Sequence, residues 1–313
     1  MITLTWVYIL AGAAFASFAL FNLADKSNPR RFGNAAFWGL MAASMWAGDW
    51  LGDFGNGLLV LALVAIAGFG GLGKTKGNEI LDVTKQDRAS RYGNGLFGVA
   101  LIIPATALAG TLLFKEFPAM FDVKQVTLIS LALGVLIALG VGYAWLRAAP
   151  SLPLSQGRRL MDSVGWAAIL PQMLASLGAV FALAGVGDVV GGIVQQAIPE
   201  ESLLGAVIAF GLGMALFTMI MGNAFAAFPV MIAAIGMPLL IKQYNGDPAI
   251  ICAIGMLAGF CGTLMTPMAA NFNLVPAALL ELKDENAVVK AQIATAVPLL
   301  VVNIALIYFL AFR

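Results

Sequence analysis

The chain has 313 residues, of which 61% are hydrophobic and only 11% are charged, and its formal net charge is +1. A soluble protein of this size could not cover so much apolar surface with so few charges, so the composition predicts an all-α polytopic membrane protein. The absence of histidine excludes imidazole-based zinc sites and proton relays, and the near-neutral charge gives no indication of nucleic-acid binding.

The first predicted span is residues 3–24, which has no Lys or Arg before it and several basic residues after it. This charge order predicts an amino terminus outside the membrane, because basic residues are enriched in cytoplasmic loops. The polar loop 74–94 is then cytoplasmic. The other spans predicted in this half are 35–50, 57–73, 95–114 and 126–145.

The basic segment 148–162 is a second predicted cytoplasmic loop, and residues 163–186 cross outward from it. Residues 187–201 are rich in glycine and too short to span, so we expect an interfacial or re-entrant segment there. No linker separates domains. The prediction is one transmembrane domain, with scaffold helices in 1–186 and the remaining elements in 187–313.

Two long uncharged runs between residues 203 and 280 are interrupted by polar, glycine and proline residues. The run 202–241 is either two crossings or a re-entrant helical hairpin that turns at Gly222-Asn223. The second run predicts a discontinuous helix, 249–265 and 274–282, with unwound backbone between. Residues 292–312 form the last span, which follows a cytoplasmic segment.

Paired interruptions of apolar segments are typical of the binding site of a secondary transporter. The amino ends of half-helices at Ala224 and Asn273 could hold an anion, because their N–H groups are unpaired. The predicted substrate-binding residues are Gly222, Asn223, Thr263, Thr266, Asn271 and Asn273. The candidates for coupling to an ion, such as sodium, are Gly262, Thr266 and Asp188.

Plainer readings of these residues remain open. Gly, Asn and Thr also let membrane helices pack closely and hydrogen-bond to one another. Asp188 is merely solvated if its segment lies on the membrane surface.

The residues around both interruptions resemble the ion transporter superfamily, in its hairpin-tip motif (221–229) and in the break of its discontinuous helix (266–273). Gly222 and Ala224 stand where that motif usually has Ser and Thr, so two hydroxyls are missing. The whole chain resembles the larger subunit of a family of two-component bacterial 5-oxoproline transporters. This resemblance implies a bacterial inner-membrane protein and a smaller membrane subunit that supplies the second half of the site, since Pro104-Ala105-Thr106 matches a second break poorly.

The predicted function is therefore import of 5-oxoproline or a similar small carboxylate, coupled to sodium or protons. The alternatives are a carrier for another organic acid, such as gluconate or a dicarboxylate, and a structural or assembly subunit with no site of its own. We expect no enzymatic activity and no cofactor, because no buried acid and base pair or metal cluster is evident.

Overall fold

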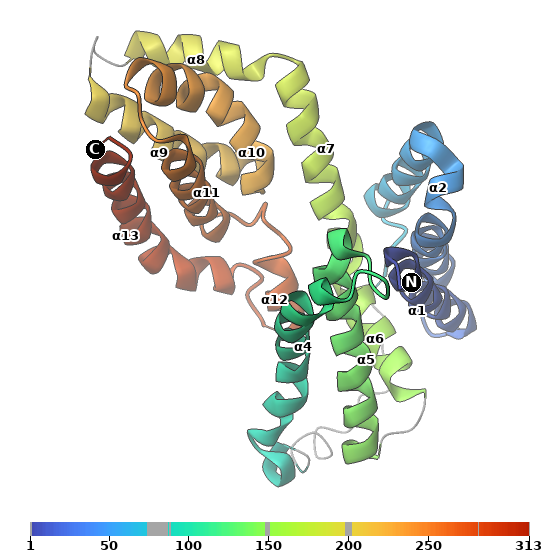
Figure 1. Ribbon diagram of the computed structural model, residues 1–313. Coiled ribbons are helices and arrows are strands. Elements are labelled where there is room, and N and C mark those ends of the chain that lie inside the picture. The colour runs from blue at the N-terminus through green and yellow to red at the C-terminus, as the bar shows by residue number, and fades with distance from the viewer. Residues whose placement is uncertain are drawn as a thin grey trace. The chain divides into compact units, whose positions relative to one another are not determined.

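The computed structural model describes residues 2–73, 87, 89–147, 151–197, 202–280 and 282–312. These residues are almost entirely helical and divide into two compact units, Met1–Gly165 and Trp166–Arg313 (Figure 1). The described helices of the first unit are α1 (Leu4–Ala24), α2 (Arg31–Gly68), α4 (Gly95–Leu113), α5 (Val126–Leu146) and α6 (Leu152–Val164). Those of the second unit are α7 (Leu170–Leu183), α8 (Val186–Ala197), α9 (Leu203–Met221), α10 (Ala224–Met231), a π-helix (Ile232–Gln243), α11 (Pro248–Leu264), α12 (Leu274–Leu279) and α13 (Ala287–Leu310).

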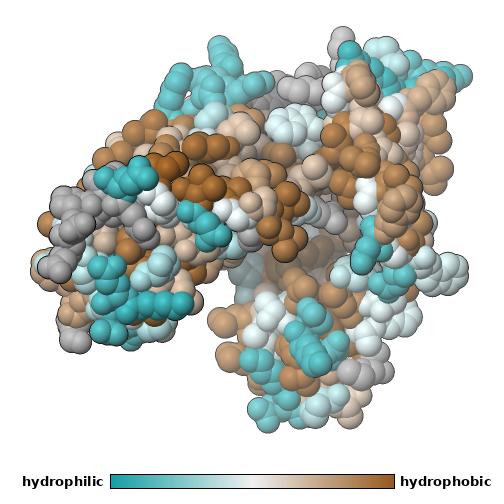
Figure 2. All heavy atoms as spheres, turned by 90° about the horizontal axis from the view of Figure 1, so that it is seen from above, coloured by the Kyte–Doolittle hydropathy of each residue, from teal (hydrophilic) through white to brown (hydrophobic). Residues whose placement is uncertain are grey.

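Within the described part of the chain, seven helical segments are long and apolar enough to cross a membrane. Their surfaces carry many exposed large apolar side chains, and apolar atoms cover much of the face seen in Figure 2. A water-soluble protein does not expose apolar surface on this scale. The prediction of an all-α multi-pass membrane protein is confirmed.

α2 contains the second and third predicted spans, because its chain direction reverses at Gly52. Gly52 has φ +61° and ψ −176°, a conformation that favours glycine. Asn56 closes the turn by donating from Nδ2 to the carbonyls of Gly48 (2.7 Å) and Gly52 (2.9 Å). The returning arm ends beside the start of α2, where the Gly73 N–H donates to Asn34 Oδ1 at 2.9 Å.

α4 and α5 pack as an antiparallel pair, with Gly134 close to the Ile103 carbonyl and Gly95 close to Trp145. Pro104 lies inside α4 without ending it. The structure therefore has no second broken helix at Pro104, the position that matched such a break poorly in the sequence.

α6 corrects the prediction of a loop for residues 152–162; residues 148–150 of the predicted loop lie outside the described residues. Pro153 stands in its first turn, where the missing N–H costs nothing, and its apolar residues recur at helical spacing. α6 packs on α1, with Gly157 against the Phe18 ring. A loop was predicted because the segment is too polar to span, but a helix that only covers the end of its neighbours needs just one apolar face.

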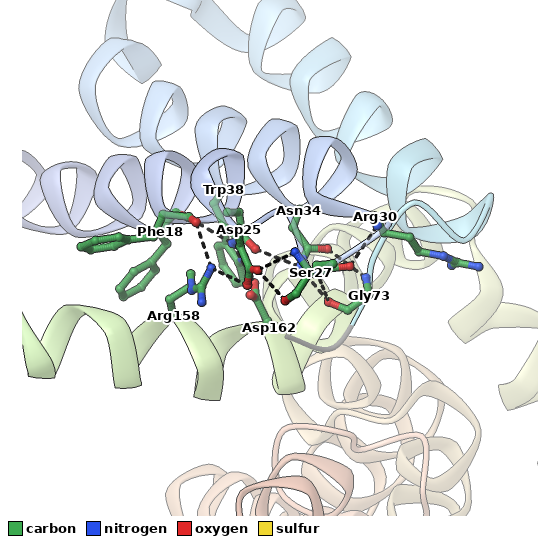
Figure 3. A network of polar contacts seen from close by, with 12 residues as sticks. Phe18, Asp25, Ser27, Arg30, Asn34, Trp38, Gly73, Arg158 and Asp162 are labelled. Carbon is green, nitrogen blue, oxygen red and sulfur yellow. Dashed lines mark hydrogen bonds and ion pairs between the residues drawn. The ribbon is translucent and has the colours of Figure 1, made fainter. Parts of the chain in front are cut away.

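α6 is held by polar contacts in the first unit (Figure 3). The buried Asp162 accepts hydrogen bonds at Oδ1 from Trp38 Nε1 (2.6 Å) and Asn22 Nδ2 (3.2 Å). One turn earlier, Arg158 forms an ion pair with Asp25 at 3.1 Å and donates to the Phe21 carbonyl at 2.9 Å. These contacts join α6 to the carboxyl-terminal end of α1 and to the first turns of α2.

In the second unit α11 packs against α9, α10 and α13 (Figure 1). Small residues permit this close packing: a Cβ on Gly259 would lie 2.8 Å from Met214 Cε and 3.1 Å from Ala224 Cβ. Glycines on the short helix α8 likewise lie against the π-helix, as at Gly191, and Gly178 of α7 lies against Ala226 of α10. α7, which the sequence analysis grouped with the scaffold helices 1–186, belongs to the second compact unit, and Gly178 permits its close approach to α10.

Candidate functional site

The first interruption separates α9 from α10 at Gly222-Asn223, as predicted. Gly222 has φ +74°, the left-handed conformation that ends helices at a glycine. Asn223 is the N-cap of α10, and its Oδ1 accepts from the Phe225 N–H at 2.7 Å. The oxygen of the Asn223 side chain thus has a structural task that the sequence interpretation did not assign to it.

The second interruption follows α11, which ends at Leu264, and precedes α12, which begins at Leu274. Asn273 organises the unwound segment. Its side chain is fully buried, and its Nδ2 donates to the carbonyls of Thr266 (2.7 Å) and Thr263 (2.9 Å). The prediction of a helix break between residues 265 and 274 is confirmed.

The two interruptions lie against each other. Thr266 Oγ1 donates to the Met219 carbonyl at 2.9 Å, and a Cβ on Gly222 would overlap the Met268 carbonyl oxygen. The turn after α9 is therefore packed onto the unwound segment after α11. The structure brings five of the six predicted binding residues into this contact or next to it. The sixth, Asn271, is half-buried in the same unwound segment that forms one side of the contact.

Helix lengths place this contact toward one end of the second unit. The Asp247 N–H donates to the Ala311 carbonyl at 2.8 Å, so the start of α11 and the end of α13 lie together, as the predicted outward location of both requires. The 17 residues of α11 then rise about 25 Å to the break. The 19 residues of α9 rise about 28 Å, which favours two crossings over a hairpin that turns halfway through about 30 Å of hydrocarbon.

Only one of the two expected anion-binding helix ends is well formed. α10 continues directly into the π-helix, so a long helical run begins at Ala224, and its first N–H groups have no acceptor within the helix. α12 has six residues, too few for an appreciable helix dipole. An anion at this contact would therefore meet the amino end of α10.

The residues predicted to couple an ion are less suited to that role in the structure. Asp188 is exposed in the first turn of α8, which agrees with the solvated alternative. The Gly262 carbonyl accepts from the Met265 N–H at 3.0 Å. Thr266 Oγ1 both donates to Met219 and accepts from the Met268 N–H at 3.2 Å.

Thr218 belongs to the contact and was missed by the sequence interpretation. It is fully buried one turn before Gly222, and its Oγ1 lies 3.3 Å from where a Cβ of Gly259 would be. A single threonine inside an apolar helix gives no sequence signal of function, because such residues also serve packing.

The described residues bring together no group of three His, Cys, Asp or Glu side chains that could hold a metal ion. A family model described as "Protein of unknown function (DUF979)" matches residues 5–312. The chain belongs to the DUF979 family. No curated protein and no solved structure matches this DUF979 chain.

Proposed function

We propose that this DUF979 chain is the solute-binding subunit of a secondary active transporter. Its solute is 5-oxoproline or a similar small carboxylate, which it imports with coupling to sodium or protons. A smaller membrane subunit completes the site. The observation that carries the proposal is the contact between the two helix interruptions, at Gly222 against Met268 and at Thr266 against Met219.

The chemistry of this contact suits a small anion with amide character. At the amino end of α10 the Phe225 N–H is bonded to Asn223 Oδ1, and the Ala224 and Ala226 N–H groups precede the first possible acceptor within the helix. These two groups can donate to a carboxylate without a cationic side chain. Asn271 is half-buried, and its Oδ1 has no hydrogen-bond partner within the described ranges. That oxygen is an acceptor for the ring N–H of a lactam such as 5-oxoproline.

A second subunit is needed because the broken helix of this chain has no counterpart in a second repeat within the part of the chain that the structure describes. Secondary transporters commonly build a site from two repeats, each with a discontinuous element. Pro104 does not break α4, so the described residues give no counterpart to the α11 break there. We infer that the smaller subunit supplies it.

The test is uptake of labelled 5-oxoproline by cells that express the chain with and without the smaller subunit, in the presence and absence of a sodium gradient. Asn271→Ala should lower uptake at least tenfold at unchanged abundance in the membrane. Asn286→Ala, at an exposed position before α13, is the matched control and should transport normally.

Three results would separate the proposal from its rivals. Uptake of labelled gluconate or a labelled dicarboxylate, without uptake of labelled 5-oxoproline, would assign the site to another organic acid. Normal uptake by Asn271→Ala would count against this site. Uptake that needs the smaller subunit but is insensitive to every substitution at the contact would make this chain an assembly subunit.

A further inference from the structure

Three buried oxygen atoms beside the contact have no hydrogen-bond partner among the residues that the structure describes. They are Thr218 Oγ1, Thr263 Oγ1 and Asn273 Oδ1, on side chains that are 0%, 4% and 0% exposed. A buried polar atom without a partner costs roughly 1–3 kcal/mol. Three of them in one region point to a ligand that uses them.

Packing brings these three side chains into the same region. Thr218 of α9 faces Gly259 of α11, and Thr263 lies one helical turn beyond Gly259 on the same face of α11. The Thr263 carbonyl accepts from Asn273 Nδ2 at 2.9 Å, which ties the third side chain to the same turn. The oxygens therefore come from α9, α11 and the unwound segment.

The hydrogen-bond geometry indicates whether the ligand of these oxygens is a cation or an anion. Both hydrogens of Asn273 Nδ2 are committed, to Thr263 and Thr266, so the amide cannot turn and its oxygen is presented as an acceptor. An acceptor repels an anion. Hydroxyl and amide oxygens are hard ligands, which bind hard cations.

The site carries no formal charge, which selects a monovalent ion. Calcium and magnesium sites use carboxylates. The described carboxylates of the second unit, which are Asp188, Asp247, Asp284 and Glu285, are all exposed. A divalent ion would thus keep its full charge in an apolar region, whereas a single charge costs far less.

We propose that Thr218, Thr263 and Asn273 bind a sodium ion between the carboxyl-terminal ends of α9 and α11, beside the interruptions. The two threonines supply the hydroxyls that are missing at Gly222 and Ala224. The role of this ion in coupling rests on the proposed function, since its positive charge would favour an anionic solute at the neighbouring amino end of α10. The binding site itself does not depend on that function.

The test measures the thermal unfolding midpoint of the purified full chain in detergent, titrated with sodium chloride at constant ionic strength with choline chloride. Sodium should raise the midpoint in a saturable way, because a ligand that binds the folded state stabilises it. Thr218→Val and Thr263→Val should each raise the half-saturating sodium concentration at least tenfold. Both variants should fold, because valine has the shape of threonine and neither hydroxyl has a hydrogen-bond partner among the described residues.

Thr111→Val is the matched control. Thr111 belongs to α4 of the first unit, where its Oγ1 donates to the Ala107 carbonyl, and it supplies none of the three proposed ligand oxygens. This variant should therefore keep the wild-type sodium response. An equal response to choline, potassium and sodium, or none at all, overturns the sodium site. Valine variants that are stabilised while the wild type ignores sodium would show that the oxygens hold water instead.

Uptake in the same variants separates the two proposals. If the wild-type chain transports 5-oxoproline but its unfolding midpoint does not respond to sodium, the sodium site is disproved and the proposed function is supported. If sodium raises the midpoint but the chain, expressed with its smaller subunit, transports no 5-oxoproline, the sodium site is supported and the proposed function is disproved.

Discussion

Asn273 and Thr266 close the unwound segment between α11 and α12, through a hydrogen bond of 2.7 Å from Asn273 Nδ2 to the Thr266 carbonyl. The second hydrogen of Nδ2 goes to the Thr263 carbonyl, which would otherwise be unpaired after the last turn of α11. One side chain thus replaces the backbone hydrogen bonds that the break removes.

We predict that Asn273→Leu lowers stability by about 2–5 kcal/mol, because it leaves two carbonyls without donors in a buried region. Thermal unfolding in detergent measures the change, and Asn286→Leu at an exposed position is the control. An unchanged Tm would mean that these carbonyls find other donors.

Gly222→Ala should be destabilising by about 1–3 kcal/mol, for two reasons. Gly222 has φ +74°, which costs a residue with a Cβ free energy, and that Cβ would overlap the Met268 carbonyl oxygen. Gly192→Ala is the control, because a Cβ there has nothing within 4 Å and alanine favours helix. If both variants gained stability, the turn at Gly222 would not pack on the unwound segment as described.

Asp162→Ala should destabilise the first unit by about 2–4 kcal/mol, since it leaves the buried Trp38 Nε1 without an acceptor and removes one of the two acceptors of Asn22 Nδ2, the other being the Phe18 carbonyl. A double-mutant cycle with Trp38→Phe isolates the Trp38 contact, because the second substitution should cost less in the Asp162→Ala background. Asp188→Ala, at an exposed carboxylate, is the control. Additive costs would exclude a direct interaction between Asp162 and Trp38.

Acid should weaken the ion pair between Arg158 of α6 and Asp25 at the end of α1. The Ser27 hydroxyl, which donates to Asp25 at 2.6 Å, and the Arg158 guanidinium lower the pKa of the Asp25 carboxyl from its ordinary 3.8, against an opposing effect of burial. A lowered folded-state pKa gives stability that is fully present above pH 3.8 and is lost as pH falls through the lower value.

Asp25→Asn should therefore flatten the decline of thermal stability as the pH falls below 3.8, while it lowers stability at pH 7. The measurement is the unfolding midpoint across these pH values, with Asp53→Asn in the exposed second half of α2 as control. A decline of the same steepness in Asp25→Asn would assign the acid sensitivity to other carboxylates.

The sequence came close to the element boundaries where local chemistry sets them. α11 was expected at 249–265 and is Pro248–Leu264; the turn at Gly222-Asn223 is where a glycine and an N-cap residue adjoin. The loop prediction was wrong for residues 152–162, because an amphipathic helix that covers its neighbours has too little hydrophobicity to be recognised as a span.

By itself the sequence determined that this is an all-helical membrane protein with two interrupted apolar runs, because hydropathy, glycine and capping residues act on the chain locally. Only the tertiary structure decided that the two interruptions meet, through residues as far apart as Met219 and Thr266. It also decided which polar atoms are already hydrogen-bonded, as in Thr266, and which are not, as in Thr218. Satisfaction of a polar group depends on neighbours that packing supplies, and no pattern along the chain specifies those neighbours.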